Sequence, residues 1–416
     1  MRLPRPLYSL IIISLIYLVF YQLQNDSNIF HNNSLQDSLI ANDILPNNCT
    51  LKFPKATNNN FQSIDDTKPI PKYFVFSAYF DDRQNPMIRV ISLLKINSNS
   101  SFKCAIWFST INVIIIPATV QNLPESSKHQ YKSSFINCPI RKFKTPYLVS
   151  IFEIDCEPIR NVLVVKIIQK SILFENRISV CVTSFTLNYS NVNQLIEMIS
   201  INQLLGASHV YIYNYSLSKN ADELLRIFIR RKFLTIISWN LPMEFISNEK
   251  EMTYISRMAL LNDCLYRNIG RFNHVVFSDL DEFLIPRQHR NWNELFKKLI
   301  LKFSIKVKVW NFRRIKFNTK LPSDPEMDNN ETIAKLNAMS LLKFRRESHI
   351  QSNHFIMIVD PMAVTILGLY KVLEFQPRVS SLDLSIDNGL CHQYRDSAIL
   401  EGNKIVIDKN ILRFQK

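Results

Sequence analysis

Short apolar runs separated by polar turns dominate the first part of the sequence after residue 72. The runs are rich in β-branched and aromatic residues and cover residues 73–80, 87–96, 103–110, 111–120 and 161–169. Runs of this length and composition are typical of β-strands. The pattern predicts a β-rich module over residues 72–170.

From residue 171 the pattern changes to strands that alternate with helices. The predicted strands are 177–185, 209–213, 233–239 and 274–278, and the predicted helices are 193–206, 222–232 and 253–267. Such alternation predicts an α/β domain over residues 171–416, with a mostly parallel sheet and helices on its faces. In a sheet of this kind the ligand site lies beyond the carboxyl ends of the strands.

The amino terminus carries a different pattern. Residues 7–23 form an almost uncharged apolar run, and Arg2 and Arg5 precede it. This length and charge distribution predict a signal-anchor helix with a cytoplasmic tail at 1–6 and a luminal remainder, as in single-pass type II membrane proteins. Residues 24–71 are rich in Asn, Ser and Asp without apolar periodicity, which predicts a stem.

Composition removes several classes of enzyme. The chain has 416 residues but only five glycines, spaced about a dozen residues apart or more, so a P-loop, a dinucleotide fingerprint and a G-x-S-x-G elbow are all excluded. The net charge of +15 favours an anionic partner. Because the basic residues are scattered, we do not expect nucleic acid to be that partner.

Seven cysteines show no C-x-x-C spacing, so no zinc cluster is indicated. In an oxidising lumen most of them are expected to pair. The odd number leaves one cysteine free or in an intermolecular bond, and Cys49 in the stem is the expected one. The second alternative predicts a disulfide-linked dimer. Seven N-x-S/T sequons are compatible with a secretory location.

The candidate chemistry follows the predicted strand 274–278. Asp279 and Asp281 come directly after this strand, and in an extended backbone residues two apart point to the same side. The two carboxylates can then bind one hard cation, with Glu282 directed elsewhere. The alternative interpretation is an ordinary surface turn.

Several segments around this D-x-D resemble a known family. The sequence LLNDCLYRNIGRFNHVVFSDLDEFLIP at 260–286, with 178–182 and 194–214 upstream, resembles the glycosyltransferase family 92 domain, a GT-A type found in type II Golgi membrane proteins. FVFSAYFDDR at 74–83 resembles a motif that precedes that domain. The resemblance implies transfer of a hexose, typically galactose, from a UDP-sugar to a glycan acceptor, with Mn²⁺ held by Asp279 and Asp281.

The sequence departs from the family pattern at three places. Gln393 stands where the family has the histidine of a His-Tyr-Arg element, and His392 is displaced by one residue. A histidine suits manganese beside carboxylates. A one-residue shift points His392 away in a strand but can be absorbed in a loop, so His392 remains a predicted metal ligand. Tyr370 and Asp360 also lie in segments that depart from the family. These changes leave open a catalytically inactive paralogue, a membrane-anchored glycan-binding protein.

The GT-A resemblance also suggests residues that contact the nucleotide. Arg257, Asn262 and Asp263 lie on the helix before the D-x-D strand, where such folds often bind the nucleotide, although Asp263 fits a capping or surface role equally well. Arg395 can bind diphosphate oxygens or form a structural salt bridge.

A transferase that inverts configuration needs a general base near the acceptor hydroxyl. Glu347, Asp360 and Asp396 are the candidates, and nothing in the sequence selects among them. Asn188 lies where a glycan would obstruct the donor, so we expect that sequon to be unmodified.

Overall fold

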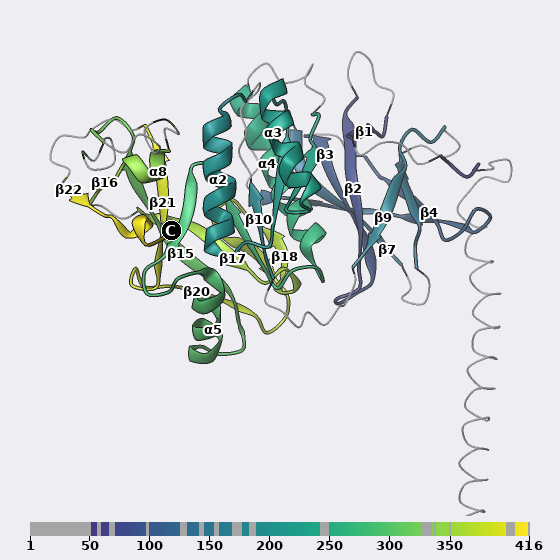
Figure 1. Ribbon diagram of the computed structural model, residues 1–416. Coiled ribbons are helices and arrows are strands. Elements are labelled where there is room, and N and C mark those ends of the chain that lie inside the picture. Colours follow the sequence, from purple (N-terminus) through teal and green to yellow (C-terminus); the bar gives the residue numbers. More distant parts are fainter. Residues whose placement is uncertain are drawn as a thin grey trace, which may run out of the picture.

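The computed structural model shows a mixed α/β protein with two curled sheets (Figure 1). It describes residues 51–55, 60–65, 71–96, 100–124, 131–140, 145–153, 158–168, 177–182, 189–241, 249–323, 325, 335, 338–348, 351–396 and 404–414. The predicted membrane segment 7–23, Cys49 and Asn188 lie outside these residues. Of the helices described, none is long and apolar enough to cross a membrane.

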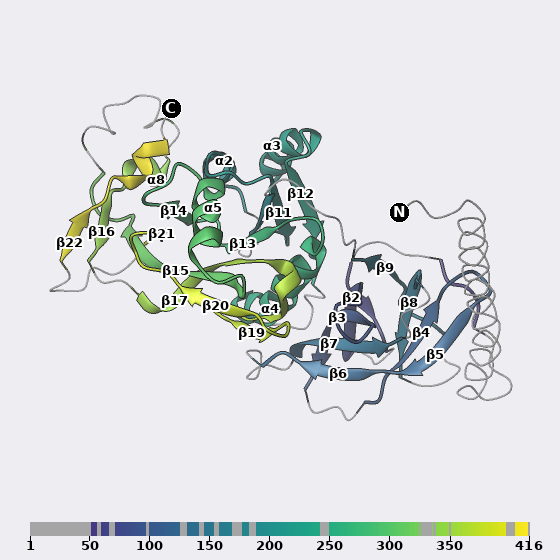
Figure 2. The ribbon, with the colours of Figure 1, turned by 90° about the horizontal axis from the view of Figure 1, so that it is seen from below.

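The first sheet is built from nine strands of the described chain, and Figure 2 shows it beside the second one. Its strands are β1 (Gln62–Ser63), β2 (Tyr73–Asp81), β3 (Met87–Lys95), β4 (Lys103–Trp107), β5 (Val113–Pro117), β6 (Thr119–Asn122), β7 (Tyr131–Pro139), β8 (Leu148–Phe152) and β9 (Leu163–Ile167). The order is β5-β4-β8-β9-β2-β3-β7-β6, with β1 paired to β2. Strand β1 lies inside the segment predicted as stem, so the ordered β-rich part begins earlier than residue 72.

The second sheet contains eleven strands within the described ranges. Its strands are β10 (Ile178–Val182), β11 (His209–Asn214), β12 (Leu234–Ser238), β13 (His274–Ser278), β14 (Glu282–Pro286), β15 (Val307–Asn318), β16 (Arg345–Glu347), β17 (Gln351–Val359), β20 (Ser380–Asp383), β21 (Gly389–Arg395) and β22 (Ile405–Ile407). The order is β12-β11-β10-β13-β17-β15-β16-β22, and the first four strands are mutually parallel. Strand β21 pairs with both β14 and β15.

The helices connect and cover these strands. They are α2 (Val192–Leu205), α3 (Lys219–Arg230), α4 (Glu249–Asn268), α5 (Trp292–Lys302), α8 (Met339–Leu342), η3 (Pro361–Ala363) and η4 (Asn410–Phe414), and β18 (Val364–Leu367) with β19 (Val372–Phe375) forms a separate hairpin. Local sequence fixes the ends of α2. The side chain of Asn191 caps its first turn by accepting from the amide of Gln194, and Gly206 ends it with φ +102°.

Helix α4 lies between the two sheets and belongs to a hydrophobic core that both share. This core contains Phe76 and Phe135 from the β-rich part together with Trp239, Met258 and other residues of the α/β part. All nine residues of β2 are buried, because one face of the strand packs on the β-rich core and the other towards α4. The β-rich part is therefore packed on the α/β part through a continuous apolar contact.

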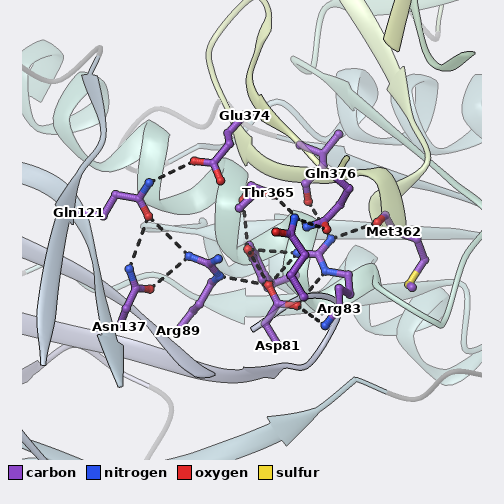
Figure 3. Close-up of polar contacts among 12 residues, drawn as sticks. Asp81, Arg83, Arg89, Gln121, Asn137, Met362, Thr365, Glu374 and Gln376 are labelled. Atoms are coloured by element: carbon purple, nitrogen blue, oxygen red, sulfur yellow. Dashed lines mark hydrogen bonds and ion pairs between the residues drawn. The ribbon is translucent and has the colours of Figure 1, made fainter. Parts of the chain in front are cut away.

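Polar contacts around Asp81 reinforce this junction (Figure 3). The guanidinium of Arg83 donates to both carboxylate oxygens of Asp81 at 2.9 Å, and Arg89 donates to one of them at 3.1 Å. Arg83 also donates to the carbonyl of Val364 at 2.8 Å, and the hydroxyl of Tyr266 donates to Asp81 at 3.3 Å. The FVFSAYFDDR motif thus ties the β-rich part to α4 and β18.

A second buried carboxylate on α4 completes the junction. Asp263 is fully buried and accepts hydrogen bonds from Ser77 at 2.5 Å, Tyr79 at 2.6 Å and Tyr213 at 2.6 Å. Arg267 pairs with it at 2.8 Å. We call the contacts made by Asp81 and Asp263 the interface network.

Two disulfides are present among the described cysteines. Cys104 joins β4 to Cys138 of β7, and Cys181 joins β10 to Cys264 of α4. Cys391 is a free and buried thiol. The expectation that most cysteines pair agrees with these bonds, and the expected free cysteine, Cys49, lies outside the described residues.

Candidate active site

The D-x-D lies where the buried strand β13 ends. All five residues of β13 are buried, as expected for a parallel strand covered on both faces. The chain then turns sharply, because the amide of Glu282 donates to the carbonyl of Asp279 at 3.2 Å, while the amide of Asp279 donates to the side chain of Glu282 at 3.2 Å. The expectation that Glu282 points elsewhere is wrong, because it assumed an extended backbone where the structure has a turn.

This turn gathers three carboxylates. Asp279, Asp281 and Glu282 offer ligand oxygens that all lie within 4.8 Å of one another, and within the described ranges they are the one cluster of this kind. We call these three residues the acidic turn. Carboxylate oxygens at this spacing are the donors that Mg²⁺ and Mn²⁺ prefer. The acidic turn therefore fits an oxygen-preferring divalent cation.

Two arginines from distant parts of the chain pair with the two aspartates. Arg257 of α4 donates to Asp279 at 2.9 Å. Arg395, at the end of β21, chelates Asp281 at 2.7 and 3.1 Å and approaches Asp279 at 3.7 Å. A cation that binds Asp281 has to compete with Arg395. The side chain of Arg395 is 52% exposed, which gives it room to move aside.

The third carboxylate is held from the other side. Arg314 of β15 pairs with Glu282 at 2.9 Å, and the amide of Gln393 donates to the same oxygen at 2.9 Å. The ring of Tyr370 lies 5.8 Å from the Arg314 guanidinium. Two of the three departures from the family pattern, at Gln393 and Tyr370, are therefore in or next to this cluster.

Crowding of like charges affects how these groups ionise. Burial raises the pKa of Asp281 above its ordinary value, the ion pair with Arg395 opposes this effect, and the charge of Asp279 adds to it. Burial and the charge of Asp279 also raise the pKa of Glu282, against the effect of Arg314. The acidic turn is thus a site where a bound cation would relieve repulsion.

The structure does not bring His392 into this cluster. His392 and Gln393 are neighbours on β21, and successive residues of a strand point to opposite faces. Gln393 therefore faces Glu282, whereas His392 packs 4.5 Å from the ring of Phe317. Burial lowers the pKa of His392 to about 3. His392 is part of a strand and not of a loop, so the shift by one residue directs its side chain away from the acidic turn.

Two of the residues predicted to contact the nucleotide have structural partners instead. Asn262 is buried and exchanges hydrogen bonds with the backbone of Leu367 at 2.9 Å in both directions. Asp263 belongs to the interface network, where both of its oxygens are engaged. Arg257 and Arg395 are the two of this group that the structure places at the acidic turn.

The three candidate bases lie at different distances from the acidic turn. Asp360 follows Val359, which pairs with Val275 near the start of the antiparallel neighbour β13, so Asp360 lies about 17 Å along the strand from Asp279. Glu347 is on β16, separated from β21 by β15. Asp396 directly follows Arg395, is exposed, and accepts a hydrogen bond from Thr319.

Arg314 is the functional residue that the sequence reasoning missed. Arg314 is part of a short basic run, Arg313-Arg314-Ile315-Lys316, and such a run usually marks a solvated face. The available signal is its phase along β15, because Arg314 is two residues from Phe312 and four from Trp310, and all three are buried. A charged residue in phase with buried aromatic residues indicates a buried partner.

Comparison with known proteins supports this description. The model of glycosyltransferase family 92 matches residues 176–416. Beta-1,4-galactosyltransferase galt-1 of Caenorhabditis elegans is 26% identical over 227 residues, which are 51% of this chain and 51% of that protein. Glycosyltransferase family 92 protein F13G3.3 of the same organism is 27% identical over 115 residues, 26% of this chain and 23% of that protein. The matched regions thus span about half of the first relative and about a quarter of the second.

Proposed function

This chain belongs to glycosyltransferase family 92, and from this premise we propose that it transfers a hexose from a UDP-sugar to a hydroxyl of a glycan acceptor. The transfer would depend on a divalent cation, Mn²⁺ or a similar ion, bound by Asp279 and Asp281. Galactose is the proposed sugar, because the relative galt-1 is named a galactosyltransferase.

The acidic turn is the observation that carries this proposal. Strands β11 and β12 lie on one side of β10, and β13 lies on the other, so the strand order reverses between β10 and β13. Ligands of open α/β sheets bind beyond the carboxyl ends of the strands at such a reversal. The acidic turn follows β13 directly at this end. This topology supports a GT-A type nucleotide-sugar domain.

In this proposal some side chains of the site would bind the donor, and another would activate the acceptor. A divalent cation, when bound, would offset the negative charge that develops on the leaving diphosphate. Asp279 and Asp281 would hold it, with Glu282 in reach. Arg395 would exchange its ion pair with Asp281 for diphosphate oxygens, which suit its planar donors. Asp396 is the proposed base, because it is next to Arg395 and open to solvent.

The location is proposed from the amino-terminal segment. The apolar run 7–23 with Arg2 and Arg5 before it supports a single-pass type II protein of the Golgi membrane whose catalytic part is luminal. Nucleotide sugar and a glycan or glycoprotein acceptor would then be its partners, and nucleic acid would not.

A second candidate function rests on the same cluster. Each carboxylate of the acidic turn already has an arginine partner, and Gln393 fills the position next to Glu282. A site stabilised in this way can exist without a cation, and it would suit a catalytically inactive, membrane-anchored glycan-binding protein.

Donor binding separates the two functions. We would titrate the purified full-length protein with UDP by calorimetry, with and without Mn²⁺, and repeat the titration with Asp281→Asn. Glu223→Gln on α3 is the matched control, because its carboxylate is 62% exposed and far along the chain from the turn. Transferase function predicts Mn²⁺-dependent binding that only Asp281→Asn abolishes. A folded wild-type protein that binds no UDP in either condition would favour the glycan-binding alternative.

A further inference from the structure

A cavity of about 370 Å³ opens at the junction of the two parts, away from the acidic turn. Its walls come from β2, β9 and the carboxyl end of α4, and they include Tyr79, Lys166, Tyr266, Arg267, Ile269 and Arg271. Arg267 is ten residues beyond Arg257 on the same helix, which corresponds to about 15 Å along the helix axis. The cavity is therefore separate from the candidate active site.

The lining of this cavity is basic. Three of its side chains, Lys166, Arg267 and Arg271, carry positive charge, and none of the described residues that line it is acidic. The carboxylate of Asp263 lies behind the wall, where Tyr79 and Arg267 both bond to it. One carboxylate cannot balance three cations, so the cavity has an excess of positive charge.

The carboxylate of Asp263 is already engaged by several partners. Ser77 donates to one of its oxygens and Tyr213 to the other. Arg267 donates to the second oxygen at 2.8 and 3.2 Å. Although burial opposes ionisation, the charges of Arg267 and Lys166 hold the pKa of Asp263 well below its ordinary value. This carboxylate is therefore a fixed component of the wall.

Lys166 is a partly buried cation in the wall of this cavity. Its Nζ donates to the hydroxyl of Tyr79 at 3.4 Å and lies 4.8 Å from the centre of that ring, but it forms no ion pair among the described residues. Burial, and then repulsion from Arg267 and Arg271 against the attraction of Asp263, lowers the pKa of Lys166 to about 8. An anion in the cavity would supply the missing charge.

The remaining walls set the size and character of a ligand. Tyr266 uses its hydroxyl on Asp81 and on the carbonyl of Thr365, so its polar group is already engaged. The volume is at the lower end of the range for small-molecule pockets. A single sugar ring or a free oxyanion matches this space, whereas a nucleotide sugar does not.

We propose that this cavity is a second ligand site, which binds a compact oxyanion (a sulfate, phosphate or carboxylate, free or carried on a monosaccharide) through Lys166 and Arg271. Arg267 contributes charge from the wall while it remains paired with Asp263. The site does not depend on the proposed transferase activity, because none of its residues belongs to the acidic turn.

The test uses the full-length protein at constant ionic strength, with chloride as the background anion. The probes are inorganic sulfate, glucose 6-sulfate, glucuronate and glucose, and binding is followed by calorimetry and by the shift in melting temperature. We expect the anionic probes to bind and glucose not to bind. Glucose 6-sulfate that binds more tightly than sulfate would identify a glycan ligand, and equal affinities would identify a free oxyanion.

Matched variants locate the binding. Lys166→Met and Arg271→Gln should each weaken the anionic probes at least tenfold, whereas Asp281→Asn and the exposed-lysine control Lys298→Met should not. Arg271 is exposed, so we expect Arg271→Gln to fold. This variant therefore tests the proposal even if Lys166→Met does not fold. The proposal is overturned if no anion binds better than chloride, if glucose binds equally well, or if both variants bind like wild type.

Discussion

The carboxyl end and the middle of helix α4 contact buried carboxylates in opposite ways. At the carboxyl end, Asp263 has four partners and is fully covered, and the contacts close the junction between the two parts of the protein. Near the middle, Arg257 reaches Asp279 in a cluster of three neighbouring carboxylates, one of which depends on a half-exposed arginine. A closed network of complementary charges gives stability, whereas a crowded and partly open one is prepared for a ligand.

The largest effect on stability should come from a substitution in the interface network at the carboxyl end of α4. Asp263→Asn removes the buried charge that compensates the partly buried Arg267, and loss of one partner of a buried ion pair typically costs about 3–5 kcal/mol. We expect the free energy of unfolding, measured by urea titration, to fall by about that amount. Asp222→Asn, in the exposed pair with Arg226 on α3, is the control and should change stability by less than about 1 kcal/mol. Equal effects of the two variants would contradict the comparison.

The acidic turn should respond in the opposite way. Asp281→Asn should reduce glycosyl transfer by at least about 100-fold, as expected for loss of a transition-state contact. Its effect on stability should stay within about 1 kcal/mol, because its partner Arg395 is half exposed and the change relieves repulsion from Asp279. Parallel measurement of turnover and of melting temperature checks both halves. A strongly destabilised Asp281→Asn would show that the turn is a structural element.

The sequence places the D-x-D directly after a buried strand, but this position alone fits an ordinary surface turn equally well, and the family resemblance is what favours a cation site. Periodicity predicts many of the strands and helices up to Ser278, with shifted ends. It misses β1, β7 and β8, and it gives one run at 111–120 where the structure has the two strands β5 and β6. Glu282 was misplaced because a single turn reverses the direction of a side chain, and spacing in the sequence does not contain that angle.

Long-range partners could not be derived in the same way. Arg314 and Gln393 reach the turn because β15 and β21 pair in a register that depends on the whole second sheet. The junction of Asp263 with Ser77 and Tyr79 spans more than 180 residues of sequence. No pattern within either segment identifies the other, so Asp263 looked equally like a nucleotide contact, a cap or a surface residue.

Acid titration should distinguish the interface network from the acidic turn, because protonation of Asp81 and of Asp281 should change the stability in opposite directions. The ion pairs with Arg83 and Arg89 outweigh burial and lower the pKa of Asp81 to about 2. Its contribution is complete above about pH 4, where it also ionises in the unfolded chain, and about 2 kcal/mol is lost as the pH falls towards 2. The raised pKa of Asp281 predicts the reverse, since its protonation favours the folded state. Between pH 5 and 2, Asp81→Asn should therefore lose less stability than wild type, and Asp281→Asn should lose more.

The smallest expected effect concerns the cavity beside the closed end. Lys166 faces Tyr79, Asp263, Arg267 and Arg271, and its pKa of about 8 means that it loses its proton as the pH rises through that value. Sulfate, which does not titrate in this range, should bind several-fold more weakly at pH 9 than at pH 7. Lys166→Arg stays charged and should remove this dependence. An unchanged pH profile in Lys166→Arg would assign the effect to another group.

The shared core around α4 sets a limit on how this protein can be divided. The family match begins at residue 176, but Phe76 and Phe135, which precede it, pack against the helix that carries Arg257. A fragment cut at that boundary would expose one apolar side of the helix to water and lose Ser77 and Tyr79, two of the four partners of Asp263. In evolutionary terms, a segment that could be transferred to another protein with its core intact would have to include both sheets. That segment is longer than the region that the family model matches.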